Sequence, residues 1–175
     1  YAANEVIGIP NVYPNYGDLK GAWAQKSLNE NEYIQVRFEY EIYIEEVNIY
    51  ETYNCGGVWK VEIMTIHGWV TVWEIPSLQV QLLKDSRIFS PDIIFVQHPS
   101  NMVKLTVNCA HADSWVEIDA IQITGSIDLT GKRTEYLLIL EQLRNYFWCS
   151  WVYNSGWSRI NSVNCKPILG AFAPV

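Results

Sequence analysis

The amino-acid sequence predicts an all-β protein built as an antiparallel β-sandwich. Apolar and polar residues alternate in several short segments, as at Ile34, Val36 and Phe38, which have polar residues between them. A period of two places the apolar residues on one buried face of a strand. Turn-forming Gly, Asn and Pro residues separate these segments, and no pattern of a crossover helix lies between them. About seven short strands joined in this way indicate an antiparallel sandwich.

The N-terminal stretch, residues 1–32, carries little strand pattern. Ala2–Gly8 is compatible with one or two helical turns, because Gly8 and Pro10 would end them. The segment Pro10–Asp18 has the sequence PNVYPNYGD. Its Pro, Asn and Gly content predicts an ordered, tightly turned loop.

Strands are predicted from Tyr33 onward. Alternation in Tyr33–Glu39 resumes at Val47–Ile49, after two glutamates. The turn residues Asn54–Gly57 then lead into the alternating segment Trp59–Ile63, so the two segments on either side of the turn are expected to form a hairpin. A second turn at His67–Gly68 follows. Further strands are expected at Trp69–Trp73, Asp92–Val96, Val103–Val107 and Trp115–Thr124.

The last of these strands changes phase. Val116 and Ile118 share one face, whereas Ile121 and Ile123 follow after an odd spacing. An extra residue in a strand produces such a slip, so a bulge is expected near Asp119–Ala120.

The C-terminal part has a different pattern. Residues 1–125 are expected to form the sandwich, and residues 126–175 a C-terminal extension. Within the extension, apolar residues recur every three to four positions across Thr134–Trp148, and Thr134 is a suitable N-cap, which predicts a helix. Beyond Cys149 no period is visible, and an irregular tail is expected.

Composition excludes several functions. The 175 residues carry a formal net charge of −7, and the 12 Lys and Arg residues are scattered. Phosphate backbones require clustered basic residues, so nucleic-acid binding is not expected. No apolar run approaches the roughly 20 residues that span a bilayer. No nucleophile-elbow or HExxH motif is present, and a non-catalytic protein is therefore expected.

Four cysteines allow three pairings if all are oxidised: Cys55, Cys109, Cys149 and Cys165. None has the spacing of a zinc site. Disulfides persist outside the reducing cytosol, so the compartment is left open: extracellular if the cysteines are paired, otherwise intracellular.

The loop from Pro10 to Trp23 offers hard oxygen ligands. Asn11, Asn15 and Asp18 supply side-chain oxygens of the kind that Ca²⁺ takes. The alternative is that these side chains cap their own turns. Both interpretations are open at this stage.

Aromatic residues are frequent in and beside the predicted loops. Trp23 and Trp59 are expected in the core, whereas Tyr13 and Tyr16 are expected to be more exposed. Exposed rings can stack on the apolar face of a sugar or insert into a membrane interface.

Several segments together resemble a discoidin-like domain. They are VIGIPNVYPNYGDLKGAWAQ (Val6–Gln25), YIQVRFE, VNIYETYNCGGVWKVEI (Val47–Ile63), VKLTVN and SWVEIDAIQITG (Ser114–Gly125). The resemblance covers about residues 3–125 in the same order and is greatest to the domain preceding the F-box in an F-box and leucine-rich-repeat protein. Such domains are galactose-binding-like jelly rolls that bind glycans, lipid head groups or proteins. The chain begins where the family has a further strand, so that edge strand is expected to be missing.

The resemblance implies two sites. In related sugar-binding modules, the first loop and the last strand hold a structural calcium ion, whose counterparts here are Asn11, Asp18 and one of Glu117 or Asp119. The hairpin loop Tyr53–Trp59 is expected to border the ligand pocket. Asn54–Gly57 contains no Arg, so a fucose-binding specificity is not expected.

We therefore predict a non-catalytic binding module, with carbohydrate as the leading ligand, bound by loops at one end of the sandwich. The alternative is a protein-interaction domain of a larger assembly, such as a ubiquitin-ligase subunit. If the protein is extracellular, the expected disulfides are Cys55–Cys109 and Cys149–Cys165. The predicted ligand-binding residues are Tyr13, Tyr16, Tyr53, Asn54, Trp59, His111 and Trp115.

Overall fold

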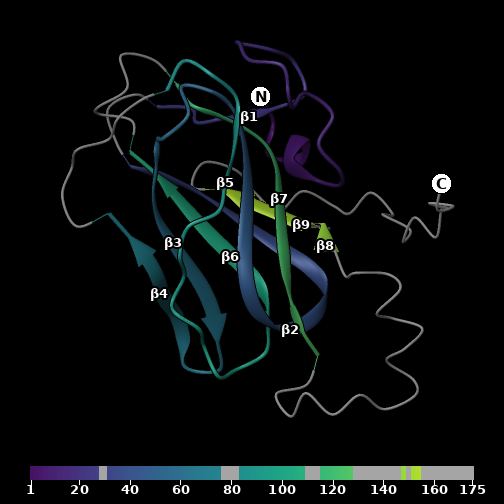
Figure 1. The fold of residues 1–175 in the computed structure, drawn as a ribbon, viewed down its shortest axis with the longest axis vertical. Coiled ribbons are helices and arrows are strands. Elements are labelled where there is room, and N and C mark those ends of the chain that lie inside the picture. Colours follow the sequence, from purple (N-terminus) through teal and green to yellow (C-terminus); the bar gives the residue numbers. More distant parts are fainter. Residues whose placement is uncertain (28–30, 76–82, 109–114, 128–146, 149–150, 155–175) are drawn as a thin grey trace, which may run out of the picture.

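The structure, a computed structural model, describes residues 1–27, 31–75, 83–108 and 115–127, together with the backbone of two short strands near the C-terminus. These residues form a short 3-10 helix and a 9-stranded antiparallel sheet (Figure 1). No helix in the described ranges is long and apolar enough to cross a membrane. The elements are η1 (Ala3–Val6), β1 (Trp23–Ala24), β2 (Glu32–Tyr53), β3 (Val58–Thr65), β4 (Gly68–Glu74), β5 (Arg87–Phe89), β6 (Ser100–Val107), β7 (Glu117–Ser126), β8 (Phe147–Trp148) and β9 (Trp151–Asn154).

The sheet is organised around the 22-residue strand β2. The order of the main path is β1-β7-β2-β6-β3-β4, with β5 and β9 also paired to β2 and β8 paired to β7. The first half of β2 pairs with β6 and β9, and its second half pairs with β7 and β5. The sheet therefore curls about β2, as Figure 1 shows. The prediction of an all-β, antiparallel fold is confirmed.

A bulge in β2 allows this one strand to contribute buried side chains in both halves of the sheet. Ile34, Val36 and Phe38 are buried at even positions, and Ile44 continues this set. The register with β7 then shifts between Ile44 and Glu46. The extra residue moves the buried positions to odd numbers, beginning at Val47.

One apolar core lies inside the curl. It takes side chains from both halves of β2 and from β3, β4, β6 and β7. Trp23 of β1 is fully buried, as expected. The largest fully buried apolar side chains are Trp23, Phe38, Ile34, Ile42, Ile49, Ile63, Leu105, Ile118, Ile121 and Ile123.

The predicted bulge of the last strand is confirmed. Tyr50 pairs with Ala120, but the next residue of β2, Glu51, pairs with Ile118. Asp119 is therefore the extra residue of β7, and it lies opposite no residue of β2. Its side chain is only 1% exposed. This buried bulge positions the site described below.

Three predicted elements differ from the structure. The segments on either side of Asn54–Gly57 do not form a hairpin, because β3 pairs with β4 and β6 and not with β2. Asp92–Val96 is not a strand: Ile94 N donates to Val72 O at 2.8 Å, and Ile94 is 70% exposed. The strand of this region is β5 instead, which pairs with Ile49–Glu51 of β2. In the extension, residues 134–146 of the predicted helix lie outside the described residues. Its last two residues form β8, so the helix prediction is wrong there.

The remaining local predictions have mixed outcomes. The expected helical turn near Ala2–Gly8 is confirmed as η1. The division at residue 125 stays a prediction, although β8 and β9, from beyond it, pair with β7 and β2. Cys55 is a buried free thiol among the described residues. The Cys55–Cys109 disulfide, which is expected if the protein is extracellular, stays a prediction. Cys109, Cys149 and Cys165 lie outside the described residues.

Candidate functional site

The first loop is anchored to the bulge of β7 by a single carboxylate. The Asp119 side chain accepts backbone N–H bonds from Asn11 at 3.2 Å, Val12 at 3.0 Å and Tyr13 at 2.8 Å. Both of its oxygens are used. Because the bulge turns the Asp119 side chain toward the loop, one buried residue fixes three consecutive residues of the Pro10–Asp18 segment.

A second buried carboxylate lies two residues before the bulge. Glu117 accepts an N–H bond from Leu19 at 3.3 Å and one from the indole Nε1 of Trp115 at 3.0 Å. Burial, together with the contact with Asp18, raises the pKa of Glu117 to about 7, although the two donors lower it. The Tyr1 hydroxyl donates to Asp18 from the other side. The pair of acids therefore joins the end of the first loop to β7.

The turn between β2 and β3, Asn54–Gly57, is held by a third buried acid. Glu51 accepts an N–H bond from Gly56 at 3.1 Å and forms an ion pair with Arg87 of β5. Asn54 has a positive φ of 46°, a conformation that Asn tolerates better than most residues. Its side-chain amide donates to the Trp115 carbonyl at 2.7 Å. The turn is thus fixed to the segment that leads into β7.

These three anchors bring aromatic side chains from separate loops into contact. The ring centroids of Tyr16 and Tyr53 are 5.6 Å apart, and those of Tyr53 and Trp115 are 6.1 Å apart. We call Tyr16, Tyr53 and Trp115 the aromatic row. All three side chains are half-buried. Burial also raises the pKa of Tyr16, opposed by a backbone hydrogen bond with Asn54.

The structure gathers most of the predicted ligand-binding residues. Tyr16, Tyr53 and Trp115 form the row, Asn54 bonds to it, and the Tyr13 ring packs edge-on against Tyr50 at 5.4 Å. Trp59 is different: it is a half-buried residue of β3, and its indole nitrogen is buried without a partner among the described residues. His111 lies outside the described residues. That any of these residues binds a ligand stays a prediction.

The residues expected to hold calcium do not fit as a set. Asp119 uses both carboxylate oxygens on N–H donors, so it has little capacity left for a cation. Asp18 and Glu117 fit better, because two acids in contact repel each other unless a proton or a cation lies between them. Among the described residues, no group of three or more His, Cys, Asp or Glu side chains is arranged to hold a metal.

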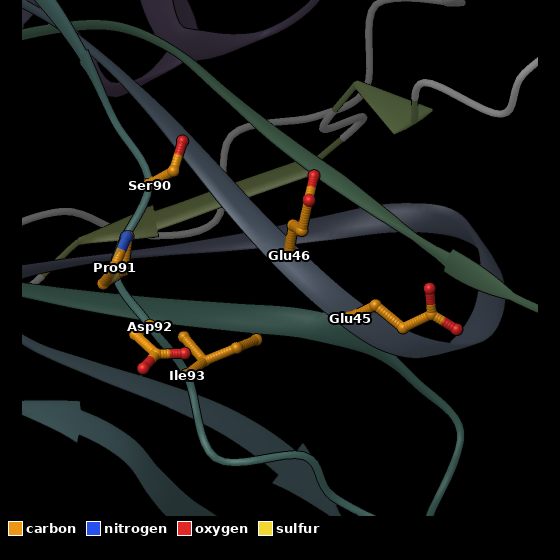
Figure 2. Close-up of a pocket in the computed structure, with 6 residues that line it drawn as sticks. All are labelled: Glu45, Glu46, Ser90, Pro91, Asp92 and Ile93. Atoms are coloured by element: carbon orange, nitrogen blue, oxygen red, sulfur yellow. The ribbon is translucent and has the colours of Figure 1, made fainter.

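Two cavities were not foreseen from the sequence. One of about 370 Å³ lies beside the β2 bulge, and Figure 2 shows that its acidic side chains point in different directions. Its lining residues are Glu45, Glu46, Ser90, Pro91, Asp92 and Ile93. The other, of about 220 Å³, is lined by Tyr1, Ala24, Gln25 and Trp115. Trp115 thus belongs both to the aromatic row and to this second cavity.

Sequence reasoning missed the residues that support the row. Glu51, Arg87 and Gln25 are polar residues in otherwise apolar or strand-like segments. The one available signal was Glu51 itself: it occupies the same face of the strand as Val47 and Ile49, where an apolar residue is expected. Its partner, 36 positions away, is not visible from the sequence.

The fold and the site define an all-β domain whose loops bring aromatic side chains together at one end of a curled antiparallel sheet. Residues 1–133 match the family described as "Pappalysin-1, SD scarf domain, C-terminal", and the chain belongs to this family. It is also similar to F-box/LRR-repeat protein 4 of Bos taurus, with 24% identity over 159 residues. That alignment covers 73% of this chain and 25% of the relative, so the chain spans about a quarter of that protein's length. The predicted similarity to an F-box and leucine-rich-repeat protein is confirmed.

Proposed function

We propose that this chain is a protein-interaction domain and that the aromatic row, with the neighbouring Asn54, is its binding surface. The observation that carries the proposal is the row itself: three half-buried rings, two from loops and one from the end of β2, held in place by buried acids. Tyr and Trp rings are enriched at the centres of protein interfaces, because they bury a large apolar area with little loss of conformational entropy.

The polar groups of the row favour a protein over a sugar. Asn54 donates its side-chain amide to Trp115 O, Trp115 donates its indole N–H to Glu117, and the Tyr16 hydroxyl has a hydrogen bond with the Asn54 backbone. Sugar recognition needs donors and acceptors for several hydroxyl groups, and these side chains use theirs internally. Mainly apolar ring area is left for a partner, which suits a protein side chain.

The relative supports the same class of function. By its name, F-box/LRR-repeat protein 4 contains an F-box and leucine-rich repeats. We propose that the present chain likewise acts inside a larger assembly, such as a ubiquitin-ligase subunit.

Site-directed photo-crosslinking tests the proposed surface. A p-benzoylphenylalanine at position 15, an exposed residue beside Tyr16, is expected to cross-link a protein partner in cells that contain the chain. The matched control places the same residue at position 66, where the natural side chain is 81% exposed in the turn between β3 and β4. Replacing Tyr16 and Tyr53 with Ala should lower the yield at position 15 by about fivefold, as expected for losing interface aromatics. Equal yields from positions 15 and 66 would reject the surface.

Carbohydrate binding, the leading expectation from the sequence, is the second candidate. The only observation in its favour is the flat area of the three rings. A glycan array separates the candidates: selective binding that is lost on replacing Tyr16 with Ala supports a lectin-like function, and silence across the array supports the protein-interaction proposal.

We also propose the finer predictions on fold and chemistry. The curled sheet is proposed to be a discoidin-like jelly-roll sandwich, and the chain to be non-catalytic.

For calcium, the proposed ligands are Asp18, Glu117 and Asn11. A chelator should then lower the melting temperature. The free energy of unfolding should fall by about 2.7 kcal/mol if the free metal was at a hundred times its dissociation constant. Asp18→Ala should abolish the difference; an unchanged melt would reject the metal.

A further inference from the structure

Two histidines from separate segments lie next to each other at the turn between β3 and β4. His67 belongs to this turn, and His98 lies shortly before β6. Their ring centroids are 6.0 Å apart, and the ring planes meet at 82°. Both side chains are exposed. The turn is at the opposite end of β3 from Asn54–Gly57, so the histidine pair is separate from the aromatic row.

The backbone on each side of the pair is held by hydrogen bonds. The His67 N–H donates to Thr65 Oγ1 at 3.1 Å, and the Thr65 hydroxyl donates to the first carbonyl of β4 at 2.9 Å. The segment that carries His98 is attached to the same strand, because Ile94 N donates to Val72 O at 2.8 Å. Two fixed segments therefore keep the two imidazoles close together.

The ring nitrogens of the pair are not used within the described part of the chain. The one hydrogen bond of His67 there is made by its backbone, and His98 has only the ring contact. A neutral imidazole offers one nitrogen lone pair, and histidine is the commonest side-chain ligand of metals in proteins. Each ring therefore has a lone pair to offer to a metal ion.

The separation of the rings is close to the one that a shared ion requires. With a Zn–N bond of about 2.0–2.1 Å, two imidazoles on one tetrahedral ion have centroids about 5 Å apart. The pair is wider than this by about 1 Å. The rings meet edge to face, so one of them must also turn to direct its nitrogen at the ion. Exposed side chains change rotamer within nanoseconds, so this adjustment is available.

We propose that His67 and His98 together bind a divalent transition-metal ion such as Zn²⁺. Imidazole ligands favour Zn²⁺, Cu²⁺ and Ni²⁺, whereas Ca²⁺ and Mg²⁺ favour oxygen. Among the described residues no third His, Cys, Asp or Glu completes the ligand set, so water fills the remaining positions. The ion would tie the turn between β3 and β4 to the segment before β6.

NMR of the histidine rings tests the proposal with Zn²⁺ alone. Zn²⁺ is titrated into the ¹⁵N-labelled 175-residue chain in neutral buffer. The ring signals of His67 and His98 should shift together and saturate with one affinity. His67→Ala should weaken Zn²⁺ binding at His98 by at least about tenfold, because the second bond to a bound ion is intramolecular. His98→Ala should have the same effect at His67.

The controls change exposed side chains next to each histidine. Ile66→Ala and Gln97→Ala should bind Zn²⁺ as the unmodified chain does. Both histidines are exposed, so their replacement should leave the fold intact, and either variant decides the matter if the other fails to fold. The proposal is overturned if the two ring signals do not saturate together, if the loss in both Ala variants is smaller than about tenfold, or if the controls lose as much affinity. The contact between His67 and His98 would then be packing of two exposed rings.

Discussion

At the scale of single residues, Asp119 determines where the first loop lies. Its carboxylate is buried in a bulge and accepts three backbone N–H bonds from the loop. Without it, three donors would have no acceptor, and each unpaired buried donor costs about 1–3 kcal/mol. Asp119, one of the residues that the resemblance suggested as a calcium ligand, thus anchors the loop that carries Tyr13 and Tyr16.

We predict that Asp119→Ala lowers the free energy of unfolding by about 3 kcal/mol or more. Asp119→Asn should cost less, because one acceptor oxygen remains. Chemical denaturation measures both. Glu46→Gln is the control, since this exposed acid bonds only to the Thr124 hydroxyl in the described residues and should change stability by less than about 0.5 kcal/mol. A loss for Asp119→Ala as small as the control's would contradict the anchoring role.

Glu117 makes the stability of the domain depend on pH. Its pKa is about 7 in the folded chain and 4.5 in the reference state, so the folded state binds the proton more tightly. The stability from this group is therefore complete below about pH 4.5 and is lost as pH rises through about 7.

The unmodified chain should lose about 1–3 kcal/mol of stability from this group between pH 4.5 and 7.5. Glu117→Gln keeps an uncharged acceptor, so it should not show this loss. The measurement is the difference in unfolding free energy between the two chains, with a chelator present. If the difference does not change with pH, the pKa of Glu117 is not raised in the folded chain.

At the scale of elements, the turn between β2 and β3 packs tightly against the residues at the start of β7. A Cβ atom on Gly57 would lie 2.3 Å from Cγ1 of Val116. The close approach needs the absence of a side chain, not an unusual backbone conformation. The contact also brings Asn54 within hydrogen-bonding distance of Trp115.

Gly57→Ala is expected to destabilise the chain by about 1–3 kcal/mol through overpacking. Val116→Ala should also be destabilising, because it removes buried methyl groups. In the double variant the new methyl group occupies the vacated space, so the combined loss should be smaller than the sum of the two. Additive losses in a double-mutant cycle would show that the two residues do not press on each other.

At the scale of the whole molecule, the reactivity of Cys55 reports whether the folded domain opens. This residue is fully buried, and burial raises the pKa of its thiol to about 12. The thiolate is the reactive form, so Cys55 should react with alkylating reagents only when the domain opens. A chain in which Cys109, Cys149 and Cys165 are replaced with Ser isolates this thiol. Its rate of alkylation by iodoacetamide should be negligible under native conditions and rise with denaturant. Fast native labelling would mean that the turn between β2 and β3 opens locally.

The local pattern of the sequence was sufficient to predict several features. The alternation at Ile34, Val36 and Phe38 predicted a strand, and the phase slip before Ile121 predicted the β7 bulge. These features depend on neighbouring residues, whose spacing decides which side of a strand each side chain occupies. The grouping of Tyr16, Tyr53 and Trp115 was also anticipated, but by resemblance to a known domain and not by the pattern itself.

Only the tertiary structure decided what the buried polar residues do. Asp119 bonds to residues 106 to 108 positions away, Gln25 to a residue 91 positions away, and Glu51 to one 36 positions away. Periodicity reports which face a residue occupies and carries no information about which distant segment covers that face. The curl of the sheet brings the first loop, the turn between β2 and β3, and the start of β7 to one end. The anchoring role of Asp119 and the lack of a partner, among the described residues, for the Gln25 amide nitrogen depend on this arrangement.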